Sequence, residues 1–192
     1  LGDVYKRQVM ISSKAKMLDR AGVFAAAVLG MTVGALGHWT WLLILLGFLL
    51  SAHKATKWRF DEKLERGMSE SNDGHRSYDN VIANGGLPGI VAIFAFVTEE
   101  WETGLWMFSA AVAVAASDTF ASEIGCLDDN VRMITTFKRC EAGINGGFSP
   151  SGQFAALAGS GLIGVLSFPA WYFTTGITDV QIGLTLSAAV VV

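Results

Sequence analysis

Two acidic side chains lie beside hydroxyl groups where an apolar stretch of the chain ends. The sequence over residues 117–125 is Ser-Asp-Thr-Phe-Ala-Ser-Glu-Ile-Gly. In a helix, Asp118 and Ser122 would share one face, with Thr119 and Glu123 on the adjoining stripe. Their oxygens suit a Mg²⁺ ion that carries phosphates, and ionisable residues at the end of an apolar helix are often functional. We therefore predict a metal site at Asp118 supported by Glu123; the alternative is a charged helix end that faces water.

A second polar segment combines cations with a glycine-rich turn. Residues 135–149 read Thr-Thr-Phe-Lys-Arg-Cys-Glu-Ala-Gly-Ile-Asn-Gly-Gly-Phe-Ser. Mobile positive charge and exposed backbone N–H groups are both suited to binding phosphate. No Lys-Ser/Thr pair follows the glycines, so the segment is not a Walker A motif. We predict a phosphate-binding loop that uses Lys138, Gly143, Asn145, Gly146, Gly147 and Ser149.

A third run, Asn84-Gly85-Gly86-Leu87-Pro88, lies near the start of another apolar stretch. Glycine residues can place backbone N–H groups against an anion, and Asn84 adds a side-chain donor and acceptor. The same run is also typical of a broken helix end. The sequence leaves both interpretations open.

Six uncharged apolar blocks separate these polar segments. They comprise residues 21–36, 39–52, 81–97, 105–117, 154–173 and 182–192. Several are shorter than the roughly 20 residues that cross a bilayer, although helices can extend beyond their apolar part. The chain is 52% hydrophobic and 16% charged, which leaves too little polar surface to cover a soluble globule. We predict an all-α fold, a polytopic transmembrane bundle of about six short helices.

The charges indicate which way these blocks point. If each block crosses once, all 14 Lys and Arg residues fall in segments 1–20, 53–80 and 118–153. The opposite links contain acidic residues and no Lys or Arg. Cytoplasmic loops carry the excess of basic residues, so we expect an integral membrane protein with its N-terminus and both motif loops in the cytoplasm. The net charge of -3 argues against a nucleic-acid partner.

The two ends of the chain are also interpretable. Residues 1–9 have no apolar periodicity and precede Met10, so we expect a non-native leader. Residues 10–192 are then one membrane domain with cytoplasmic loops 53–80 and 118–153. Because the last apolar block stops at Val192, we expect a chain truncated at its C-terminus.

Taken in order, the three polar motifs resemble those of the DUF92 (TMEM19-like) integral membrane family. That family includes a phytyl-phosphate kinase and is distantly similar to CTP-using polyprenol kinases and phosphatidate cytidylyltransferases. Lys138, Glu141 and Gly143 match the positions of a Lys-x-x-Glu-x-Gly-type loop in these enzymes. The resemblance implies CTP and Mg²⁺ as donor and metal, and an isoprenoid lipid monophosphate in the bilayer as acceptor. Glu141 would then belong to the nucleotide site.

The polar motifs and the family resemblance leave three possible functions. The first is a membrane kinase in which Asp118 and Lys138 are catalytic and Thr119 and Ser122 are further nucleotide ligands. Its acceptor phosphate, with a second pKa of about 6, is already ionised near neutral pH, so positioning and charge neutralisation suffice. The alternatives are cytidylyl transfer to a lipid phosphate and a small transporter. Transporters bind substrate near the midplane, whereas these motifs gather at helix ends, which disfavours the last.

Overall fold

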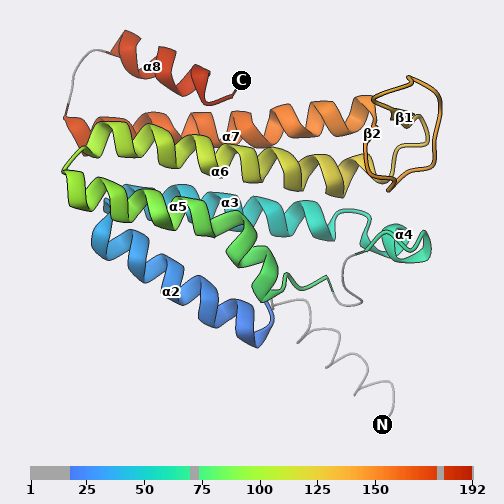
Figure 1. Ribbon diagram of the computed structural model, residues 1–192, viewed down its shortest axis with the longest axis horizontal. Helices are drawn as coiled ribbons and strands as arrows, with labels where there is room; N and C mark the ends of the chain where they lie inside the picture. The colour runs from blue at the N-terminus through green and yellow to red at the C-terminus, as the bar shows by residue number, and fades with distance from the viewer. Residues whose placement is uncertain (1–17, 70–73, 177–179, 192) are drawn as a thin grey trace.

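Seven helices and one two-stranded hairpin make up the chain that the computed structural model describes, residues 18–69, 74–176 and 180–191 (Figure 1). The predicted leader, residues 1–9, lies outside this range. The elements are α2 (Arg20–Leu36), α3 (Trp39–Lys57), α4 (Phe60–Glu65), α5 (Tyr78–Thr98), α6 (Trp101–Gly125), β1 (Arg132–Met133), β2 (Gly147–Phe148), α7 (Pro150–Thr175) and α8 (Val180–Ala189).

The prediction of an all-α membrane bundle is confirmed. Helices α3, α5, α6 and α7 are long and apolar enough to cross a membrane, and α2 and α8 are shorter apolar helices. Each predicted apolar block coincides with one of these six. Large apolar side chains such as Phe24, Val114 and Phe154 lie on the outside of the bundle, 70–74% exposed. An outer surface of this kind suits contact with lipid.

Helix α6 forms the centre of the bundle. Its buried side chains pack against α3, α5 and α7, and Phe108 stacks near Trp41 of α3 with ring centroids 4.9 Å apart. Helices α6 and α7 approach so closely that a Cβ at Gly159 would lie 2.7 Å from the carbonyl oxygen of Ala116. Small residues at such positions allow close helix packing in lipid.

The long polar segments meet at one end of the bundle. Figure 1 shows the β1–β2 hairpin and α4 at the same end, while the α2–α3 and α5–α6 links lie at the opposite end. This arrangement follows from the alternating direction of the apolar helices. It brings the segment after α3 beside the segment after α6.

Helix α5 shows that the Asn84-Gly85-Gly86 run is not a broken helix end and that its backbone N–H groups do not form an anion site. The helix continues from Tyr78 to Thr98 through the run, so its N–H groups lie inside a helix and are not free to bind an anion. Pro88 lacks an N–H for the carbonyl of Asn84, and α5 bends along its length in Figure 1. A Cβ at Gly85 would overlap Leu29 of α2, which gives this glycine a packing role.

Candidate functional site

A polar hollow of about 1060 Å³ lies at the hairpin end of the bundle. It is bounded by the end of α6, the start of α7, the glycine-rich loop and the turn after α4. The lining residues are Arg66–Ser69, Asp118, Ala121, Ser122, Gly125, Cys126, Val131, Glu141–Ser149, Gly152 and Gln153. We call this space the loop hollow. It joins the acidic motif of α6 to the glycine-rich motif, as the sequence predicts.

Two stripes of α6 carry the acidic motif. Asp118, Ser122 and Gly125 line the loop hollow, and Asp118 is exposed. Thr119 and Glu123 lie on the adjoining stripe and face other helices. Thr119 is buried and accepts a hydrogen bond from Arg76 Nη2 at 3.2 Å. The structure therefore confirms the shared face of Asp118 and Ser122, but it turns Thr119 away from the predicted nucleotide site.

Glu123 is paired with a buried lysine. Lys63 of α4 is 1% exposed, and its Nζ donates to Glu123 Oε2 at 2.7 Å. Nζ also donates to the carbonyls of Ala55 and Thr56, each at 2.9 Å, which uses all three of its protons. The Thr56 hydroxyl donates to Glu123 Oε1 at 2.6 Å. Both carboxylate oxygens thus accept hydrogen bonds from the protein, and Glu123 does not line the loop hollow, so its metal role stays a prediction.

The glycine-rich loop forms the outer wall of the loop hollow. Strands β1 and β2 pair antiparallel at its base, with Arg132 opposite Phe148. The loop has positive φ angles of +83° at both Gly143 and Gly146, which side chains rarely adopt. The space beside Gly143 is open, since no atom lies within 4 Å of where its Cβ would be. Gly143, Asn145, Gly146, Gly147, Glu141 and Ser149 all line the hollow.

Lys138 lies on the hairpin outside the lining of the loop hollow, and its side chain is exposed. Among the described residues the lining contains one cation, Arg66 at the end of α4. Arg66 donates to Asp129 Oδ1 at 3.0 Å and to Glu62 Oε1 at 2.8 Å. The hydrogen bond to Asp129 is the main reason that the pKa of Arg66 is raised. No motif in the sequence identifies Arg66.

The N-terminus of α7 also reaches the hollow, held by Asp128. Ser149 caps the helix by accepting from the N–H of Gly152 at 3.1 Å. Asp128 accepts from the Ser151 hydroxyl at 2.6 Å and from the N–H of Asn130 at 2.8 Å. The Ser151 bond is the main cause of a lowered pKa at Asp128. The Asp128 carboxylate therefore holds the first turn of α7, which directly follows the glycine-rich loop. The only sequence signal for this role is the Asp128-x-Asn130 turn.

Asp118 also connects the loop hollow to a groove between α5 and α6. The groove measures about 660 Å³ and is lined mainly by apolar residues of the two helices, with Asn84 and Asp118 among them. Asn84 is therefore near Asp118, although neither Gly85 nor Gly86 lines either space. Within the described residues no three His, Cys, Asp or Glu side chains form a metal cage. A metal at Asp118 would need oxygen ligands from a bound phosphate.

Comparison with known proteins gives a family and several relatives, among them the following two. The family model described as "Integral membrane protein DUF92" matches residues 8–192. An uncharacterized membrane protein of Methanocaldococcus jannaschii is 31% identical over 83% of this chain and 65% of its own length. Protein PGR of Arabidopsis thaliana is 30% identical over 80% of this chain and 58% of its own length. The chain thus spans less than two thirds of either relative. No solved structure matches.

Proposed function

The chain belongs to the DUF92 family of integral membrane proteins, and we propose that it forms the core of a membrane kinase. The reaction would transfer the γ-phosphoryl group of CTP to an isoprenoid lipid monophosphate. The observation that carries this proposal is the loop hollow itself. Asp118 and the glycine-rich loop line one space, with both polar and apolar walls, at the end of apolar helices. A lipid phosphate and a water-soluble nucleotide can both reach such a place.

The residues of the hollow fit a Mg²⁺–triphosphate complex. Magnesium is usually held by one or two carboxylates together with substrate phosphates, and Asp118 and Glu141 are the carboxylates that line this space. The ion would neutralise charge on the phosphates during transfer. Gly143 leaves open space beside the backbone in which a phosphate could lie, and Asn145 adds an amide donor. Arg66, the one cation of the described lining, contacts the same space while paired with Asp129 and Glu62.

For this phosphoryl transfer, the protein mainly has to position the two substrates. An oxygen of the acceptor phosphate would attack the γ-phosphorus, and the bond from that phosphorus to the bridging oxygen would break. The products are a lipid diphosphate and CDP. With a second pKa of about 6, the acceptor oxygen carries no proton that a base must remove at neutral pH. This matches a hollow whose described lining holds no histidine.

The proposal requires the hairpin end to face the cytoplasm, where CTP is found. We expect single cysteines at Asn130 and Thr103, in a background with Cys126 and Cys140 changed to serine, to label from opposite sides. An impermeant thiol reagent added outside intact cells should reach Thr103→Cys only, because the basic segments remain inside. Labelling of Asn130→Cys alone would show the inverted orientation.

Nucleotide binding gives a direct test of the loop hollow. We expect CTP with Mg²⁺ to raise the melting temperature of the full-length protein in detergent, since a ligand that binds only the folded state stabilises it. Asn145→Ala should weaken CTP binding by about 1.5–3 kcal/mol, the range for a hydrogen bond to a charged group. Lys138→Ala should have a smaller effect, because Lys138 lies outside the lining.

The matched control is Asn130→Ala, an exposed asparagine in the same loop region but outside the hollow. It should leave CTP binding unchanged. If the wild-type protein keeps its helices yet gains no stability from CTP at any Mg²⁺ concentration, the proposed function is wrong.

A further inference from the structure

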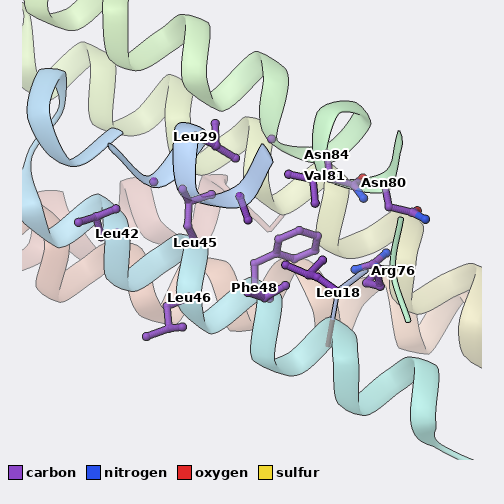
Figure 2. A pocket seen from close by; sticks show the side chains of 14 residues that line it. Leu18, Leu29, Leu42, Leu45, Leu46, Phe48, Arg76, Asn80, Val81 and Asn84 are labelled. Carbon is purple, nitrogen blue, oxygen red and sulfur yellow. The ribbon is translucent and has the colours of Figure 1, made fainter. Parts of the chain in front are cut away.

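A second cavity lies between α2, α3 and α5, on the side of α5 away from the loop hollow. Its volume is about 210 Å³, and its wall is mainly apolar, with Leu29 of α2 and Leu42, Leu45, Leu46 and Leu49 of α3 among the lining residues. Figure 2 shows Leu29, Leu42 and Leu45 on one side of the cavity and Arg76, Asn80 and Asn84 together on the other. The cavity is therefore apolar along most of its length and polar at one end.

The polar end is built around a buried cation. Arg76 is 8% exposed, and its guanidinium lies 5.8 Å from the ring of Phe48. Arg76 has polar contacts besides this ring, including one to Thr119, so an anion bound here would add to its existing contacts. Asn80 and Asn84 line the same end and add amide donors. The polar end of this cavity is suited to an anion.

The polar end also adjoins the catalytic motif. Arg76 Nη2 donates to the hydroxyl of Thr119, the residue that follows Asp118 on α6. Asn84 lines both this cavity and the groove that contains Asp118. A ligand whose anionic group lies at Arg76 and Asn84 would therefore contact residues that adjoin Thr119 and the groove containing Asp118.

From this geometry we propose that the cavity binds the acceptor lipid. Its phosphate would lie at Arg76 and Asn84, and its isoprenyl chain would extend along α3 past Leu45. This inference rests on the proposed function for the identity of the reaction, but the binding site can be tested without it. Amphiphiles of this kind match a cavity with an apolar length and one cationic end.

The size of the cavity predicts how much of the chain it holds. An apolar cavity of about 150 Å³ accommodates benzene, so 210 Å³ holds a slightly longer segment, roughly two isoprene units. The lining residues of α3 run from Leu42 to Leu49, a rise of about 10 Å at 1.5 Å per residue. Leu46 at this wall is 49% exposed, so longer chains can leave toward the surrounding lipid. Affinity should rise up to about ten carbons and then level off.

Gly30 allows the cavity to be filled without a clash. It lines the cavity, and no atom lies within 4 Å of where its Cβ would be. Gly30→Leu should occupy the space of the chain and weaken binding of geranyl monophosphate at least tenfold, measured by thermal stabilisation of the full-length protein. The matched control is Gly161→Leu on α7, where the space beside the glycine is equally open but outside the cavity. It should bind geranyl monophosphate as the wild type does.

A second variant, Arg76→Met, tests the polar end separately. It should weaken binding of geranyl monophosphate at least tenfold and leave the weaker binding of geraniol unchanged. Inorganic phosphate alone should stabilise the wild type far less than geranyl monophosphate, because most of the wall is apolar. Wild-type affinity for geranyl monophosphate in folded Gly30→Leu, or equal stabilisation by inorganic phosphate, would overturn the assignment.

CTP separates this inference from the proposed function. Gly30→Leu should retain full stabilisation by CTP, because Gly30 is not part of the loop hollow. If the wild type fails to bind CTP while its lipid binding still depends on Gly30 and Arg76, the kinase proposal fails and the lipid site stands. If CTP binds but neither Gly30→Leu nor Arg76→Met changes lipid binding, the lipid site is wrong and the kinase proposal stands.

Discussion

Changing Asp118 to asparagine should lower phosphoryl transfer by roughly 10³-fold, the scale seen when a transition-state electrostatic contact is lost. Asp118 is the acidic residue of α6 that faces the loop hollow, and the substitution removes its charge while keeping its shape. Because the residue is exposed, the bundle should fold as before. The measurement is turnover across a Mg²⁺ series, with the melting temperature recorded for the same sample.

The matched control for Asp118 is Asp61→Asn in the first turn of α4. It removes the same charge from an exposed aspartate that does not line the loop hollow. This variant should keep wild-type turnover. Near-normal turnover of Asp118→Asn at any Mg²⁺ concentration would remove Asp118 from the site.

The largest expected effect on stability belongs to the pair between Lys63 and Glu123. Changing Lys63 to methionine should destabilise the protein by about 3 kcal/mol, the lower end of the range for leaving one charge of a buried pair alone. The lower end applies because the Glu123 side chain is 17% exposed. The double variant with Glu123→Gln should lose less, since no uncompensated charge remains. Urea or thermal unfolding in detergent measures both.

A surface ion pair of the same helix serves as the control. Arg59 and Glu62 form an exposed pair, so Arg59→Met should cost less than about 1 kcal/mol. If Lys63→Met costs no more than Arg59→Met, the buried pair does not stabilise the end of the bundle. The structural role of Glu123 as the partner of Lys63 would then lose its energetic support.

The helices and one face of the site could be predicted from sequence because both depend on local pattern. Six apolar blocks coincide with six helices, since hydropathy reports directly on lipid contact. The shared face of Asp118 and Ser122 follows from the helical repeat once the helix is taken to continue. The glycine-rich loop was identified by composition, and its two left-handed glycines confirm a tight turn.

The remaining parts of the site depend on contacts between distant segments. Nothing near Glu123 in the sequence indicates that Lys63, sixty residues earlier, is buried in the bundle and donates a hydrogen bond to the Glu123 carboxylate. The position of Arg66 in the loop hollow likewise depends on α4. This helix lies inside the highly charged loop 53–80, where the sequence contains no apolar block. For Asn84-Gly85-Gly86 the local signals for a break were present, but packing of α2 against Gly85 favours a continuous helix.

The fate of the γ-phosphate of CTP tests the central claim most directly. Full-length protein in lipid would be incubated with Mg²⁺, an isoprenyl monophosphate and CTP labelled at the γ-phosphate, and the lipid and nucleotide products separated. We expect label in a lipid diphosphate and release of equimolar CDP, with neither formed by Asp118→Asn. Label released as pyrophosphate, with the CMP unit joined to the lipid, would contradict it, and so would CTP left intact by a folded protein that binds both substrates.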